Sequence, residues 1–181
     1  MRERRDDPFY KALDTEFEEL LLDYAILSID DQYCGMDTHK AAVIKSLEAF
    51  HNRKRVGNRY WPPQYAIDEN KMFATIESNS DFFKIESFWI STSSKTKCMA
   101  NPEVINYWYA FSEPPYGISY GKDEFDKLNN MLFGKELEIY RWNDDFSTYF
   151  DDGKEWWGTA MWSIYDKEKN RMVVIGASLT D

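Results

Sequence analysis

The chain has 181 residues, of which 43% are hydrophobic and 30% charged, and this balance predicts a folded globular protein and excludes a disordered one. The formal net charge of -10 at pH 7 argues against binding to nucleic acid or anionic lipid, because both carry charge of the same sign. No apolar run approaches the roughly 18 residues of a membrane-spanning helix, so we expect no membrane association.

The cysteine pattern and the first residues bear on the cell compartment. Cys34 and Cys98 form no CxxC pair and have no metal-ligand spacing. Residues 1–7 are charged, where a secretory signal would carry an apolar run. These features predict a cytoplasmic protein with reduced thiols. The length predicts one globular domain over residues 1–181.

The first half of the chain is predicted to be mainly helical. Asp7 followed by Pro8 is typical of a helix start, because Asp caps the first turn and Pro is tolerated at the first helical position. Apolar residues at three- and four-residue spacing then predict an amphipathic helix over 8–27. A second helix is expected to begin at Asp37 or Thr38 and to end near Arg55.

The middle of the chain mixes both element types. Aromatic and β-branched content predicts short strands over 72–77 and 85–92, although apolar spacing around the second segment also approaches that of a helix. An Asn-Pro pair predicts a helix over 101–112. Residues 122–133 carry an apolar stripe typical of a helix, and Gly134 is expected as its left-handed C-cap.

The C-terminal third is predicted to be rich in strands. We expect strands over 137–142, 159–165 and 172–177, with the last two paired as a β-hairpin around a polar turn. The sequence therefore predicts an α+β fold in which about four helices pack on an antiparallel or mixed sheet that ends in a C-terminal β-hairpin.

One segment concentrates carboxylates among aromatic residues, in a protein whose aromatic share of 17% exceeds what a core of this size needs. The candidate binding residues in this segment are Trp142, Asp144, Asp145, Tyr149, Asp151, Asp152, Glu155, Trp156 and Trp157. Tyr116 and Tyr120, from a glycine-containing loop, are further candidates for lining a cleft.

Segment 142–157 permits several interpretations. Paired carboxylates serve as general acid and base in glycoside cleavage, and oxygen ligands suit Ca²⁺ or Mg²⁺, although adjacent Asp pairs do not match an EF-hand loop. The segment also fits a partner-binding face with aromatic anchors and steering carboxylates. A purely structural interpretation places the aromatic side chains in the core and the Asp residues in turns.

Other chemistry finds little support in the sequence. His39 and His51 are twelve positions apart, so they cannot form the paired ligands of a zinc helix. No glycine-rich phosphate-binding motif is present. We therefore predict no metal and no cofactor, and the sequence nominates no catalytic residue.

The functional hypothesis follows from charge and composition together. The sequence favours a small cytosolic binding protein whose acidic, aromatic surface engages a basic protein partner, as an immunity or inhibitor protein does. The alternative is a hydrolase, or a protein that binds a small ligand or cation, with its carboxylates in an aromatic cleft.

Overall fold

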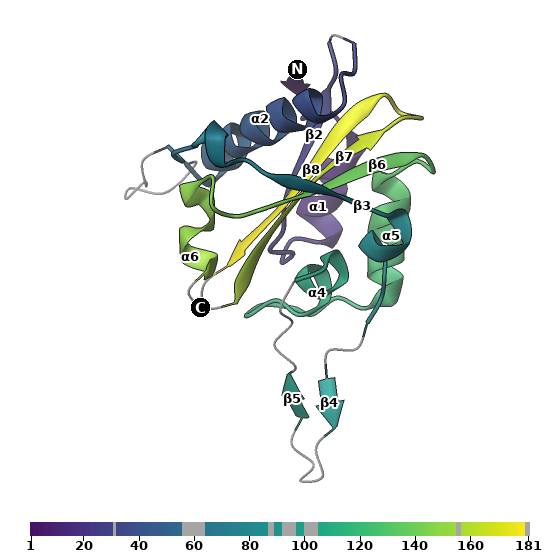
Figure 1. Ribbon diagram of the computed structural model, residues 1–181. Helices are drawn as coiled ribbons and strands as arrows, with labels where there is room; N and C mark the ends of the chain where they lie inside the picture. The colour runs from purple at the N-terminus through teal and green to yellow at the C-terminus, as the bar shows by residue number, and fades with distance from the viewer. Residues whose placement is uncertain are drawn as a thin grey trace.

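The computed structural model describes residues 1–30, 32–55, 64–86, 89–91, 97–99, 105–154 and 157–179. Its centre is a six-stranded antiparallel sheet with the strand order β1-β2-β8-β7-β6-β3, and helices lie against the sheet (Figure 1). The strands are β1 (Arg2–Glu3), β2 (Asp23–Ser28), β3 (Ala74–Glu77), β6 (Leu137–Trp142), β7 (Gly158–Asp166) and β8 (Arg171–Leu179). The predicted α+β class and the C-terminal hairpin, formed by β7 and β8, are confirmed.

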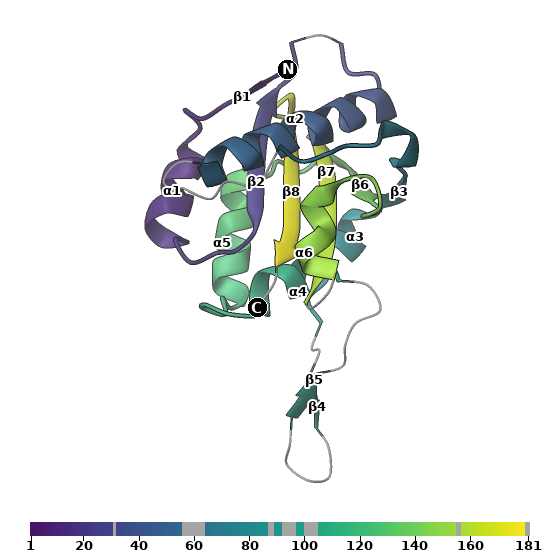
Figure 2. The same ribbon diagram turned by 90° about the vertical axis from the view of Figure 1, so that its left-hand side faces the viewer.

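Helices cover both faces of the sheet (Figure 2). The α5 face carries α1 (Pro8–Glu16), α3 (Asn79–Phe82), α4 (Tyr107–Ser112) and α5 (Lys122–Leu132). The α2 face carries α2 (Met36–Arg55), α6 (Asp151–Lys154) and the short 3-10 helix η2 (Thr148–Phe150). A second 3-10 helix, η1 (Glu69–Lys71), precedes β3. In the described part of the chain, no helix combines the length and the apolar content needed to cross a bilayer.

A small second sheet lies outside this arrangement. It consists of β4 (Trp89–Ser91) and β5 (Lys97–Met99), which pair antiparallel. Both views show this pair extending away from the main sheet (Figures 1 and 2). The predicted strand over 85–92 is therefore confirmed at Trp89–Ser91. Residues 85–86 are not part of the strand, and residues 87, 88 and 92 lie outside the described residues.

The alternation of side chains along the central strands supplies two separate cores. On β8, Val173 and Ile175 join the core on the α5 face, whereas Met172 and Val174 join the core on the α2 face. Because helices cover both faces, a central strand must be apolar on both sides. This explains the nearly continuous apolar run in the sequence of β8.

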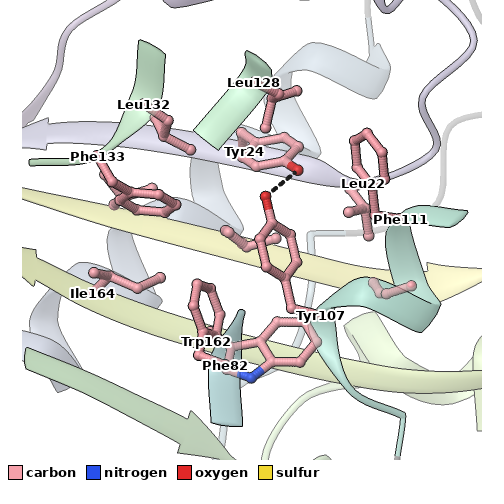
Figure 3. Close-up of a cluster of buried hydrophobic side chains, with 14 of the residues drawn as sticks. Leu22, Tyr24, Phe82, Tyr107, Phe111, Leu128, Leu132, Phe133, Trp162 and Ile164 are labelled. Atoms are coloured by element: carbon pink, nitrogen blue, oxygen red, sulfur yellow. Dashed lines mark hydrogen bonds between the residues drawn. The ribbon is translucent and has the colours of Figure 1, made fainter. Parts of the chain in front are cut away.

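The core on the α5 face is largely aromatic (Figure 3). Phe82 stacks on Tyr107 with ring centroids 4.6 Å apart, and it meets Trp162 of β7 edge-on at 6.0 Å. The hydroxyl oxygens of Tyr24 and Tyr107 lie 3.0 Å apart within this cluster. Burial of such rings is the main stabilising contribution that aromatic residues make, so this core takes up many of the aromatic residues noted in the sequence.

The predicted helix over 8–27 is wrong in its second half. Helix α1 ends at Glu16, where Phe17 leaves the helical region with φ -128° and ψ 34°, and Asp23–Ser28 is strand β2. Strand β2 pairs with β8 and is buried on both faces, so its apolar run has no strict alternation. A short apolar run of this kind fits a helix and a buried strand equally well.

Two further predictions about helix ends need correction. Helix α4 begins at Tyr107 and is capped by the Asn106 side chain, and residues 101–104 of the predicted helix lie outside the described residues. Helix α5 is confirmed, but Gly134 is not a left-handed C-cap, because the chain leaves the helix through an extended Phe133. A Cβ at Gly134 would lie 2.5 Å from the Glu168 carboxylate, so close approach explains this glycine better than its conformation does.

Candidate functional site

The aromatic residues of segment 142–157 are mostly interior. Trp142, Phe146, Tyr149 and Phe150 are each at most 5% exposed and belong to the core on the α2 face. The Tyr149 hydroxyl donates to Asp23 at 3.0 Å. Buried side chains of this kind cannot serve as anchors for a partner unless the core opens.

Trp157 is half-buried at the other end of the same segment. Its ring stacks on Tyr109 at 5.5 Å, and its indole N–H donates to the backbone carbonyl of Glu113 at 2.8 Å. Glu155 and Trp156, two of the predicted site residues, lie outside the described residues.

The described carboxylates of this segment have separate roles. Asp144 accepts a hydrogen bond from the Thr159 hydroxyl at 2.6 Å, and Asp145 forms an ion pair with Lys154 at 3.2 Å. Asp151 and Asp152 are exposed in the first turn of α6, where negative charge complements the helix dipole.

A shallow hollow of about 270 Å³ includes some of these carboxylates. Asp145 and Asp151 share it with Asp68, but Lys71 and Lys154 also line it and balance much of the negative charge. Among the residues that the structure describes, no group of three or more His, Cys, Asp or Glu side chains is arranged to hold a metal ion. The segment therefore has the features of core and turns more than those of an aromatic cleft.

An exposed acidic and apolar surface lies elsewhere, where the end of α1 meets the loop before α5. We call it the acidic apolar surface, and its residues are Glu18, Glu19, Tyr116, Ile118, Tyr120, Asp123 and Glu124. Tyr116 is 50% exposed and Ile118 is 49% exposed, in contrast to the buried aromatic side chains of segment 142–157. Large apolar side chains exposed in one short loop are typical of an interaction site.

Tyr120 fixes this loop against the end of α1. Its ring lies 5.6 Å from Phe17 and 5.7 Å from Phe111. Gly117 has φ +85°, and a Cβ there would lie 3.7 Å from the backbone oxygen of Glu19. The loop therefore lies against residues 17–19, which follow α1, and it carries Tyr116 and Ile118 on either side of Gly117.

The electrostatics of this surface are negative. Burial raises the pKa of the Tyr120 phenol, and the charges of Glu19, Glu18 and Glu124 raise it further. The lysines of α5 have acidic partners of their own, since Lys127 pairs with Glu16 and Lys122 with Asp126. Arg5 and Arg53, which line a hollow with Glu18, both lie near Glu3. Within the described ranges, no cation pairs with Glu18 or Glu19, and both carboxylates are exposed.

A hydrogen-bonded relay crosses the α2 face and joins α2 to β6 and β7. It is fully buried at His39 and Ser163 and partly buried at Tyr33 and Glu138. The Trp142 indole donates to Ser163 Oγ at 2.8 Å, and Ser163 Oγ lies 2.7 Å from His39 Nδ1. On the other side of the ring, His39 Nε2 lies 3.0 Å from the Tyr33 hydroxyl, which donates to Glu138 at 2.5 Å. The Trp142 indole and the Tyr33 hydroxyl are donors at the two ends of the relay. The Ser163 hydroxyl therefore donates to His39 Nδ1, and His39 Nε2–H donates to the Tyr33 oxygen.

Ser163, His39 and Glu138 are the residue types of a hydrolytic triad, but their geometry is structural. His39 and Ser163 are 0% exposed, and Glu138 is reached mainly through Tyr33. A nucleophile must meet its substrate, and this hydroxyl is enclosed between α2 and the sheet. Burial lowers the pKa of His39 to about 4, although the Glu138 charge acts in the opposite direction, so the ring is neutral at pH 7.

Sequence reasoning did not connect the relay residues, because His39 and Ser163 are 124 positions apart. One signal was present. His39 lies four and eight positions before Val43 and Leu47, on the buried stripe of α2, where a polar side chain needs a partner.

Comparison with known proteins adds no identity to these observations. No family model, no curated protein and no solved structure matches this chain.

Proposed function

We propose that this protein is a binding protein that engages a basic protein partner through the acidic apolar surface, as an immunity or inhibitor protein engages a cationic target. The observation that carries the proposal is a loop with two half-exposed side chains, Tyr116 and Ile118. The same loop lies beside Glu18 and Glu19 at Gly117 and Tyr120. Two of the candidate residues from the sequence, Tyr116 and Tyr120, belong to this surface.

The two kinds of side chain have different physical roles in such binding. Apolar anchors contribute most of the affinity when a partner buries them, and tyrosine is among the residues enriched at such positions. Carboxylates around them raise the association rate of a cationic partner and disfavour anionic ones. The net charge of -10 extends this attraction beyond the surface itself.

The alternative, an enzyme or ligand-binding protein with carboxylates in an aromatic cleft, has less support. Of the described carboxylates in segment 142–157, Asp144 accepts from Thr159 and Asp145 pairs with Lys154. The hollow that contains Asp145 is lined by lysines as well as acids. A general acid requires a carboxyl group in an apolar, desolvated position, whereas Asp145 is exposed.

The test is selection from a displayed random peptide library, followed by affinity measurements at low and physiological salt. We expect selected peptides to be rich in Lys and Arg, and to bind more weakly as salt screens the charges. The double variants Tyr116→Ser/Ile118→Ser and Glu18→Gln/Glu19→Gln should each weaken binding by about tenfold or more.

The matched control is Asp151→Asn/Asp152→Asn, which removes the same number of charges from the predicted segment. We expect it to leave affinity within about twofold, as for a change outside the contact surface. Peptides without net positive charge, or equal affinity for wild type and for the Tyr116/Ile118 variant, would contradict the proposal. Loss of binding in the control alone would place the site in segment 142–157 instead.

A further inference from the structure

The sheet has two edge strands, and they differ in how they are protected. Strand β1 is two residues long and carries charged side chains, Arg2 and Glu3, which is a common protection against pairing with another chain. Strand β3, at the opposite edge, contains one charged residue, Glu77, and this carboxylate accepts a hydrogen bond from the Trp162 indole at 2.8 Å. It is thereby directed toward the sheet rather than across the edge.

The outward edge of β3 offers a defined set of backbone groups. Asn143 donates its backbone N–H to the Phe73 carbonyl at 2.9 Å, so Phe73 faces β6 in the ladder. Hydrogen-bonded residues alternate along an antiparallel pair, and the register pairs Thr75 with Arg141. The N–H and C=O groups of Ala74 and Ile76 therefore point away from β6.

Two large apolar side chains along this edge are exposed. Ile76 is 73% exposed and Phe73 is 68% exposed, the two highest values among the large exposed hydrophobic residues of the described chain. They lie on opposite faces of the strand, because they are three positions apart in an extended segment. An added strand would contact Ile76 on one face and Phe73 on the other.

The charged residues around β3 bear on which kind of strand can pair with this edge. The acidic residues near β3 are Asp68, Glu69, Glu77, Asp81 and Glu86. Cations offset most of these charges, since Lys71 pairs with Asp68, Lys40 with Glu69 and Lys84 with Glu86, and the Arg141 charge acts on Glu77. The five acids and these four cations leave one net negative charge at the edge, and the charge of -10 on the whole chain favours a basic strand over an acidic one or a second copy.

We propose that β3 is a docking edge that pairs with an extended, basic segment of a partner protein, through the outward backbone groups of Ala74 and Ile76. Main-chain hydrogen bonds supply affinity in this mode of recognition, and alternate side chains supply specificity. The inference shares the basic partner class with the proposed function but uses a different surface, so each can fail without the other.

The experiment measures amide hydrogen exchange with a synthetic peptide that alternates Lys with Val or Ile. We expect the peptide to slow exchange at the amides of Ala74 and Ile76, and to leave Thr75 unchanged because its N–H already bonds to β6. The same peptide with a central Pro, and an analogue with Glu in place of Lys, should give no protection, because the first cannot complete the ladder and the second is repelled.

Two matched variants separate this edge from the acidic apolar surface. Ile76→Lys and Ile118→Lys make the same change at two exposed positions, so both should fold. We expect Ile76→Lys to weaken peptide binding by about tenfold or more and Ile118→Lys to leave it within about twofold. The reverse pattern would overturn the docking edge while supporting the proposed function.

Two other results would also overturn the inference. One is protection that is equal at Ala74 and Thr75, because it would indicate a general change in stability rather than strand addition. The other is a dimer of the free protein that is lost in Ile76→Lys, measured by sedimentation, because the occupant would then be a second copy.

Discussion

His39 and Ser163 approach to 2.7 Å between Nδ1 and Oγ, and this contact joins α2 to the central strand β7. Both side chains are fully buried, and each has a second partner, Tyr33 for His39 and Trp142 for Ser163. Every polar atom in this contact is therefore satisfied. A buried polar group that loses its partner costs about 1–3 kcal/mol, so the relay stabilises the fold only while it is complete.

Removal of the Ser163 hydroxyl should show this cost. Ser163→Ala leaves the Trp142 indole N–H and His39 Nδ1 without partners, so we expect a loss of about 2–4 kcal/mol in the free energy of unfolding, measured by urea denaturation. Ser119→Ala, at an exposed position, is the control and should change stability by less than about 0.5 kcal/mol. Equal stability of the two variants would contradict the relay.

The neutral state of His39 predicts a dependence of stability on pH. Its pKa is about 4 in the folded protein, where burial disfavours the charged ring, and about 6.5 in an unfolded chain. The unfolded state therefore binds a proton first as pH falls, and stability is lost between about pH 6.5 and 4. Below this pH window, the folded protein has lost about 3 kcal/mol of stability through this group.

The measurement compares the variants rather than the wild type alone, because burial raises the pKa of Glu77 and a raised carboxyl pKa acts in the opposite direction. We expect His39→Gln to lose the decline in stability over this window, while His51→Gln retains it. A decline that is unchanged in His39→Gln would show that other groups cause it.

The buried tyrosine pair predicts unequal effects from two equivalent changes. The Tyr107 hydroxyl donates to Asn129 Oδ1 at 3.0 Å, so Tyr24 is the donor in the pair. Tyr107→Phe leaves two groups without partners, and we expect it to cost about 2–3 kcal/mol. Tyr24→Phe removes only the terminal donor, so its cost should be about 1 kcal/mol. Equal losses in thermal or urea unfolding would argue against this order of donors.

Two glycines with positive φ should respond differently to alanine. Gly158 has φ +124°, and a Cβ there would lie 2.2 Å from Ile105 Cδ1, so strain and a contact both oppose Gly158→Ala. We expect a loss of about 3 kcal/mol in unfolding free energy. Gly35 has φ +61° with no heavy atom within 4 Å of that position, so Gly35→Ala should cost only about 1 kcal/mol. A larger loss at Gly35 would contradict this order.

The elements that were predicted well have strong local signals. Helices α2 and α5 carry apolar residues at helical spacing, and the sequence of β6 begins with an apolar-polar-apolar alternation typical of a strand. The hairpin of β7 and β8 followed from two apolar runs around a polar turn. Strand β2 was missed because a strand buried on both faces has no period of its own.

The candidate site could be predicted only in composition. The sequence indicated that carboxylates and aromatic rings would occur together, and it included Tyr116 and Tyr120 beside segment 142–157. The structure places Trp142 and Tyr149 in the core and leaves Tyr116 exposed. The sequence does not show whether an aromatic side chain is buried or exposed, because this depends on which elements pack over it.

What the sequence by itself determined is the class of the protein: an acidic α+β chain with enough apolar residues for a core and no apolar run of membrane length. Tertiary structure alone decided the strand order, the relay from Trp142 to Glu138 and the exposed edge of β3. The reason is physical. Composition and local spacing act through neighbours in the chain, whereas each of these features depends on contacts between segments far apart in sequence.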